Sequence, residues 1–187
     1  MKGLNKNKPL HQLISVLLNH LYTCVAMLMI VFAFFAWSIG VTPVQEIISV
    51  ITMLFYVCVI YVKASEIANH DIKSYSETKP DVKKPVLWGI VIIAITYILY
   101  ALYALIARDG SVAPIWLKAI ISLLFNTWTM PYMGVMGAAR GQIMPYSHIF
   151  WIIVPFLGLI PGYIAGKNKI FVSDWMRRIM YKKEKQL

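Results

Sequence analysis

The stretch Val86–Ala107, VLWGIVIIAITYILYALYALIA, contains no charged residue and follows directly on Pro85. A helix that crosses the hydrocarbon core of a bilayer needs about 20 mostly apolar residues. This stretch supplies 22 of them, from position 86 to position 107. It therefore predicts a transmembrane helix, and the rest of the chain can be compared with it.

Three other stretches meet or nearly meet the same requirement. Leu21–Gly40 is uncharged, Val44–Val62 has its one charge at Glu46, and His148–Gly166 is apolar after its first residue. Hydrophobic residues make up 59% of the chain and charged residues 14%, whereas soluble domains have about 45–50% and about 25%. The sequence therefore predicts an all-α, polytopic transmembrane helical bundle.

A fifth apolar stretch, Ile115–Ala139, is ambiguous because it contains Lys118 and Pro131. The distribution of lysine and arginine indicates whether this stretch spans the membrane, since cytoplasmic loops carry an excess of both. With four spans and the N-terminus inside, 15 of the 18 lie on the cytoplasmic side, and Arg108, Lys118 and Arg140 lie outside. With five spans the split is 9 to 9. We therefore expect four spans with both termini in the cytoplasm, and five spans as the alternative.

On the four-span topology, residues 115–139 belong to the outer face of the membrane. They are expected to form a helix that lies in the interface or a re-entrant element that dips into the bilayer. Pro131, Gly134 and Gly137 suit a broken helix of the second kind. Irregular backbone at membrane depth must be covered by protein or line a wet cavity, so this segment is a candidate functional element.

Candidate residues for lining a ligand site or pore come from the same outer region. Three tyrosines share one broad side of the third predicted span and indicate either a pocket for an amphiphile or ring packing. Polar groups in or beside 115–139 are costly near hydrocarbon and often functional, although a lysine there can also extend to the interface. The candidates are Tyr97, Tyr100, Tyr103, Lys118, Asn126 and Arg140.

Two segments flank the spans on the predicted cytoplasmic side. Segment 9–20 has leucine and isoleucine at helical spacing, with three lysines beside it. This pattern predicts an amphipathic interfacial helix or a cytosolic extension of the first span. Segment 167–187 is a basic tail in which a second amphipathic helix is expected from Ser173. The net charge of +10 fits anionic lipids at the cytoplasmic face better than nucleic acid, for which no reader motif is visible.

The segment 63–85 is expected to be a cytoplasmic loop. Its Glu66 and His70 are four residues apart, but two such ligands are weak evidence for metal, and a solvated connector is favoured. Cys24 and Cys58 lie in apolar runs without metal-binding spacing. The deeper parts of the spans lack Asp, Glu, Lys and Arg, and no catalytic motif is present. We therefore expect no metal, no cofactor and no enzymatic activity.

Gly158, Gly162 and Gly166 recur every four residues and form a ridge along the last predicted span. Such ridges let helix backbones approach closely. The contact is expected either within the bundle or with a second chain. A homo-oligomer or a membrane-protein partner is therefore a candidate.

A few short segments carry a resemblance. They are Gly162–Gly166, the later Ile179–Lys183, and Asp71–Gly89, in which a tyrosine precedes an Asp-x-x-Lys motif. Together they resemble small multi-span membrane proteins of Gram-positive bacteria that have no assigned function. The match covers about a third of the chain. It implies a bacterial plasma membrane and a cytoplasmic tail, and it implies no activity.

The sequence supports two hypotheses about function. The first is a non-enzymatic membrane subunit or scaffold that acts through helix packing with itself or a partner. The alternative is a small channel or transporter for a hydrophobic or amphiphilic solute, motivated by the tyrosines and the broken outer helix.

Overall fold

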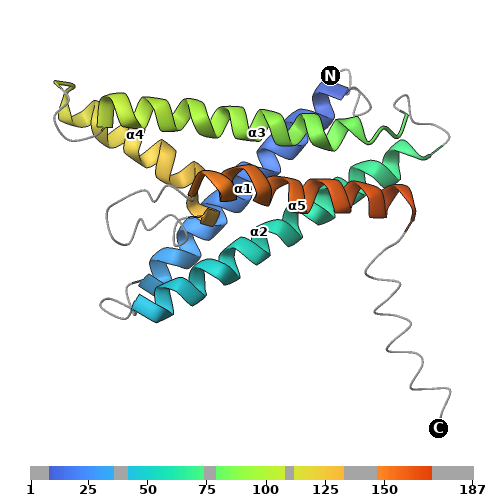
Figure 1. The fold of residues 1–187 in the computed structure, drawn as a ribbon, viewed down its shortest axis with the longest axis horizontal. Coiled ribbons are helices and arrows are strands. Elements are labelled where there is room, and N and C mark those ends of the chain that lie inside the picture. Colours follow the sequence, from blue (N-terminus) through green and yellow to red (C-terminus); the bar gives the residue numbers. More distant parts are fainter. Residues whose placement is uncertain (1–8, 36–41, 74–78, 108–111, 133–146, 170–187) are drawn as a thin grey trace, which may run out of the picture.

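A computed structural model describes residues 9–35, 42–73, 79–107, 112–132 and 147–169. These residues form five α-helices and two short turns of other helical types (Figure 1). The elements are α1 (Pro9–Phe35), α2 (Thr42–Asp71), α3 (Lys83–Leu102), the π-helical turn η1 (Tyr103–Ala107), α4 (Ile115–Trp128), the 3₁₀ turn η2 (Met130–Tyr132) and α5 (Ser147–Lys167).

Four helical stretches are long and apolar enough to cross a membrane: 9–31, 50–71, 83–107 and 148–167. The described residues include no strand. The predicted fold class, an all-α bundle with four spans, is therefore confirmed, and the fold is that of a membrane-embedded protein. The α4 helix has 14 residues, which is about 21 Å of helix and falls short of the ~30 Å hydrocarbon core.

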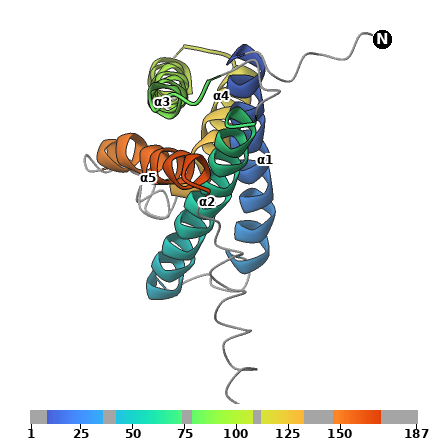
Figure 2. The ribbon, with the colours of Figure 1, turned by 90° about the vertical axis from the view of Figure 1, so that its right-hand side faces the viewer.

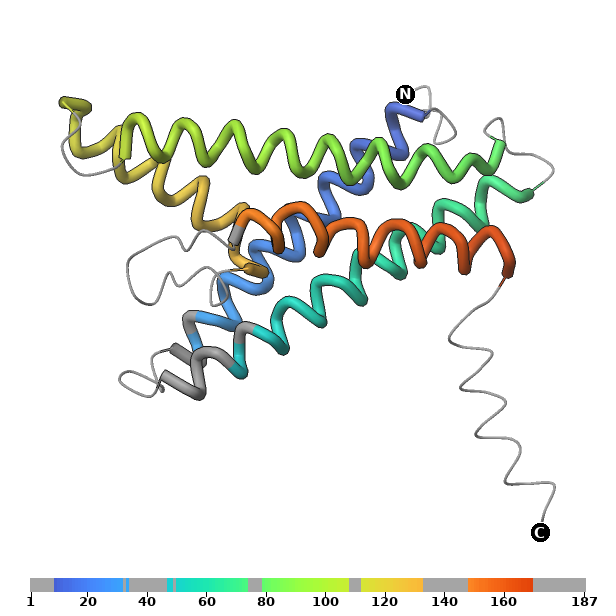
Figure 3. The backbone as a smooth tube through the Cα atoms, in the orientation of Figure 1, coloured from blue at the N-terminus to red at the C-terminus, as the bar shows by residue number. Residues whose placement is uncertain are grey.

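The four long helices meet at one end of the molecule. The tube in Figure 3 places the first turns of α1 and α3 and the last turns of α2 and α5 at that end. We call it the Asp71 end, after the last residue of α2. The most extensive contact between elements joins α2 and α5. Figure 2 shows α1 and α2 side by side, with α5 and α3 to one side of them.

The α4 helix starts near the end of η1 and folds back toward the middle of the bundle (Figure 1). It contacts η1 and α3, and its continuation η2 contacts α1, α2 and α5. All three residues of η2 are buried. Residues 115–132, the described part of the segment that made the topology ambiguous, therefore run from the surface into the bundle.

The helices cross two of the predicted boundaries. Segment 9–20 is not a separate interfacial helix, because α1 runs unbroken from Pro9 to Phe35, which agrees with the alternative of a helical extension of the first span. Polar residues near position 20 suggested an interface, but His20 is fully buried between helices. The first part of the predicted loop 63–85 is helical, because α2 continues to Asp71. The structure describes the predicted tail at 167–187 only as far as residue 169.

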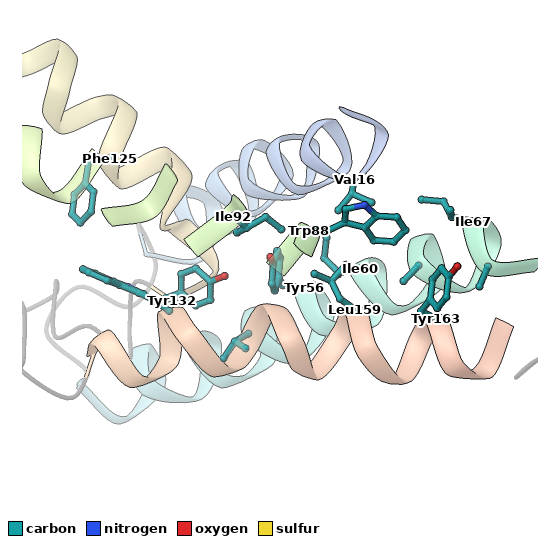
Figure 4. Packing of buried hydrophobic residues seen from close by; sticks show 14 residues of the cluster. Val16, Tyr56, Ile60, Ile67, Trp88, Ile92, Phe125, Tyr132, Leu159 and Tyr163 are labelled. Carbon is teal, nitrogen blue, oxygen red and sulfur yellow. The ribbon is translucent and has the colours of Figure 1, made fainter. Parts of the chain in front are cut away.

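An apolar layer fills the bundle between the Asp71 end and its middle. Every helix except α4 contributes to it, and its residues are at most 2% exposed. Figure 4 shows most of these side chains between Tyr163 on one side and Tyr56 on the other. The layer consists of Val16, Ile60, Ala64, Trp88, Ile92 and Leu159.

Candidate functional site: two buried polar layers

A buried carboxylate joins four helices at the Asp71 end. Asp71 accepts hydrogen bonds from Gln12 Nε2 at 2.6 Å and from Lys84 Nζ at 2.6 Å. The hydroxyl of Tyr163 donates a third at 2.8 Å. We call Gln12, Asp71, Lys84 and Tyr163 the Asp71 layer. Because they come from α1, α2, α3 and α5, one side chain ties the four long helices together.

The local sequence explains how this layer forms. Asp81 Oδ1 accepts a hydrogen bond at 2.9 Å from the backbone N–H of Lys83, which fixes the start of α3. The backbone N–H of Asp81 donates to the Tyr163 hydroxyl at 3.1 Å, so that oxygen both accepts and donates. The Asp71 side chain is fully buried, and that of Lys84 is 17% exposed. A buried charge of this kind is tolerated because it is paired and hydrogen-bonded.

A second polar cluster lies near the middle of α1, α2 and α3. His20 Nδ1 is 2.7 Å from the Tyr56 hydroxyl, and His20 Nε2 is 3.5 Å from Cys24 Sγ. Cys24 in turn donates to the backbone oxygen of Trp128 at 3.2 Å. The side chains of His20, Cys24 and Tyr56 are fully buried. We call these residues, together with Thr96 and Trp128, the His20 layer.

The direction of these hydrogen bonds follows from counting hydrogens. The Cys24 thiol has one hydrogen, which it gives to Trp128 O. The His20 ring also interacts with that oxygen, so Nε2 carries the proton and donates toward Cys24 Sγ and Trp128 O, and Nδ1 accepts from the Tyr56 hydroxyl. The result is a directed chain of protic groups, from the Tyr56 hydroxyl through the imidazole and thiol to a carbonyl.

The end of α4 completes the His20 layer. The indole of Trp128 donates from Nε1 to Thr96 Oγ1 at 2.9 Å, and its ring centroid is 4.3 Å from that of His20. Thr129 Oγ1 donates back to the backbone oxygen of Phe125 at 2.7 Å. The C-terminus of a helix carries partial negative charge, so α4 directs that charge toward the imidazole.

Tyr132 of η2 lies beside this chain. Its ring centroid is 5.7 Å from that of Tyr56, and its side chain is 1% exposed. Its buried hydroxyl interacts with that of Tyr56 but makes no well-aligned hydrogen bond among the described residues.

The tyrosines predicted to line a pocket are packing groups in this structure. The ring of Tyr103 stacks on Phe125 with centroids 4.8 Å apart. Tyr97 and Tyr100 each lie within 6 Å of both Trp151 and His148. These rings fill the space between α3, α4 and α5.

The polar candidates of the outer region are not brought together by the described residues. Lys118 and Asn126 both lie on α4 and are half-buried, and neither belongs to the His20 layer. Arg140 lies outside the described residues.

The three glycines of the last span all face α2. A Cβ at Gly158 would lie 3.0 Å from the backbone oxygen of Val57. At Gly162 and Gly166 it would overlap the backbones of Tyr61 and Ser65. The close approach of the ridge is therefore made within the chain, which removes it as the surface for a second chain.

Among the possible metal ligands noted at 66–71, Asp71 lies apart from Glu66 and His70, which border one surface hollow. The Glu66 side chain is 63% exposed and pairs with Lys63 at 3.5 Å, while Asp71 is buried in its own layer. Among the residues that the structure describes, no group of three His, Cys, Asp or Glu side chains could hold a metal ion.

Sequence reasoning missed the His20 layer and assembled no paired polar groups at one depth. One signal was present: His20 and Cys24 are four residues apart on one helix face. Their partners are 36 and 104 residues away along the chain, so no local pattern could identify them. Comparisons with protein-family models, with curated proteins and with solved structures find no match to this chain.

Proposed function

We propose that this protein is a membrane transport protein, that the His20 layer is its working site, and that the species it moves is the proton. The observation that carries the proposal is the end of α4, which stops inside the bundle against a fully buried imidazole. Ionisable groups within a membrane are costly and mark ion and proton pathways. Interrupted helices that end at mid-membrane are typical of transporter sites.

The proton is favoured over a larger solute because the layer is filled. The side chains of Tyr56, His20 and Cys24 are fully buried and in direct contact, so protons can pass among these three groups and no room for a solute is left between them. The Trp128 carbonyl orients the thiol and does not itself relay a proton. Histidine is suited to this role because its neutral ring accepts a hydrogen bond at one nitrogen and donates from the other. The amphiphile version of a transporter loses one of its two motivations, because its tyrosines pack against neighbouring rings.

The apolar layer supplies the barrier that such a protein needs. About 22 Å of α2 separates Tyr56 from Asp71, and Ile60 and Ala64 within that interval are fully buried. A path to the Asp71 end therefore requires this layer to open or to admit water. Hydrophobic constrictions gate other membrane pathways in this way.

Proton flux into liposomes tests the proposal. Full-length protein is reconstituted with a pH-sensitive dye inside, and a potassium gradient with valinomycin sets the membrane potential. We expect acidification faster than in empty liposomes. His20→Gln should return the rate to that of empty liposomes, because glutamine keeps hydrogen bonds but cannot pass a proton between two ring nitrogens.

His148→Gln is the matched control. His148 belongs to the last span but stacks on Tyr97 and lies outside the protic chain, so its variant should keep the wild-type flux. A wild-type rate equal to that of empty liposomes would remove the proposal, and so would unchanged flux in His20→Gln.

The proposed setting is a plasma membrane with the Asp71 end in the cytoplasm. This orientation is supported by the excess of Lys and Arg in the three segments at that end. They are the segment before the first span, the connection between the second and third spans, and the tail after the last span. The resemblance to small membrane proteins of Gram-positive bacteria agrees with it, and anionic lipids fit the same face. A reporter enzyme that works only in the cytoplasm should be active when it is fused after Leu187. Activity of a reporter that works only outside the cytoplasm would contradict this orientation.

A subunit or scaffold role is the second candidate, and α3 favours it. In the most apolar part of the 83–107 stretch only 11% of the residues are buried, against 50% for α5. A span with so few contacts has room for a partner helix. Native mass spectrometry of the detergent-solubilised protein should then show a dimer or a second chain, whereas a strict monomer argues against this role.

A further inference from the structure

An open groove runs between α1 and α2 near the Asp71 end. It consists of two neighbouring hollows of about 190 Å³ and 310 Å³ that share Lys63 and Glu66. The smaller hollow lies toward the end of the bundle, beside His11 and His70. The larger one continues toward the middle, beside Cys58 and Val59. None of these residues belongs to the His20 layer.

The shared pair gives the groove both signs of charge. Lys63 Nζ and Glu66 Oε2 are 3.5 Å apart, which is a loose ion pair. Their side chains are 29% and 63% exposed, and an exposed pair of this kind adds little stability. Both charges therefore remain able to bind a ligand, and they balance each other.

The surroundings of the groove are apolar. Leu10, Ile14 and Leu18 of α1 and Val62 of α2 are exposed large hydrophobic residues on the same pair of helices. Along α2, Cys58 lies about 12 Å deeper than Glu66. A molecule that fills both hollows thus meets charge near the end of the span and apolar surface farther in.

We propose that this groove binds one phospholipid with a zwitterionic headgroup that bears a primary ammonium, as in phosphatidylethanolamine. The phosphate binds Lys63, and the ammonium donates hydrogen bonds to Glu66. An acyl chain follows Val59 and Cys58. An anionic headgroup would satisfy Lys63 but leave Glu66 facing negative charge, and a trimethylammonium group has no N–H to donate.

Lipid titrations read by native mass spectrometry test this site. The delipidated full-length chain is mixed with phosphatidylethanolamine, phosphatidylcholine or phosphatidylglycerol that carry the same acyl chains. We expect phosphatidylethanolamine to bind about tenfold more tightly than the other two, as the loss of one charge-assisted hydrogen bond implies. Glu66→Gln should remove this preference, and Lys63→Met should weaken binding of all three lipids.

Two further variants complete the design. Lys79→Met removes an exposed lysine outside the groove and should leave lipid binding unchanged. Val59→Trp should fill the larger hollow and reduce binding without a change in charge, and circular dichroism confirms that each variant is folded. Equal affinity for the three lipids, tightest binding of phosphatidylglycerol, or unchanged binding in Glu66→Gln would overturn the proposal.

Discussion

The two buried polar layers differ in charge and in place. The Asp71 layer contains an ion pair, lies at one end of the bundle, and places a bonded donor from each neighbouring helix on one carboxylate. The His20 layer is built from neutral protic groups and lies near the middle of the helices.

The difference separates a structural role from a functional one. A fully partnered charge that joins four helices fixes their arrangement, and the loss of any partner leaves a buried group uncompensated. A neutral polar cluster does not bring all four long helices onto one side chain, so its presence in mid-bundle needs another reason. The predictions below test this contrast.

The largest effect on folding is expected from Gly162→Val. A side chain at this position overlaps the backbone of Tyr61 and pushes α5 from α2, which moves Tyr163 away from Asp71. We expect a loss of about 3 kcal/mol, at the upper end for overpacking, in reversible unfolding in mixed micelles. Ile164→Val on the exposed side of the same helix should cost far less, and similar losses for both variants would contradict the packing described.

Asp71→Ala should follow with a loss of about 2–3 kcal/mol, because three hydrogen bonds vanish and Lys84 loses its partner. The double variant Asp71→Asn/Lys84→Met removes both charges together and should recover much of that stability. The same unfolding measurement checks both. If the double variant is less stable than Asp71→Ala, the ion pair is not the source of the loss.

Tyr56→Phe should cost about 1–2 kcal/mol, because it leaves the buried His20 Nδ1 without its donor, and it removes the first donor of the protic chain. We expect proton flux to fall to the level of empty liposomes while the fold persists. Tyr22→Phe, on a side chain that is 73% exposed, is the matched control and should change neither quantity. Normal flux in Tyr56→Phe would exclude that hydroxyl from the path.

The smallest effect on stability is expected from Tyr132→Phe. Its hydroxyl interacts with that of Tyr56 but makes no well-aligned hydrogen bond among the described residues, so its removal should change the unfolding free energy by less than about 0.5 kcal/mol. A loss above about 1 kcal/mol would show that the hydroxyl makes a hydrogen bond.

The spans were predictable because their signal is local. An uncharged run such as Val86–Ala107 needs no partner to be recognised, and the charge balance alone separated four spans from five. The exact ends were not predictable, because Asp71 and His20 look like interface residues until other helices cover them.

The two polar layers could not be predicted from the sequence, for a related reason. Asp71 meets Gln12 across 59 positions and Tyr163 across 92, and each residue taken singly resembles a loop or interface group. The glycine ridge shows the reverse case. Its spacing predicted a close helix contact, and the structure was needed to identify α2 as the neighbour.

The most direct test of the account compares the two layers in one assay. Proton flux is measured in liposomes that contain equal amounts of folded His20→Gln or Asp71→Asn/Lys84→Met, under the same imposed potential. The account predicts that His20→Gln is as slow as empty liposomes, while the double variant keeps most of the wild-type rate. Full flux in His20→Gln, or its loss only in the double variant, would contradict the assignment of function to the His20 layer.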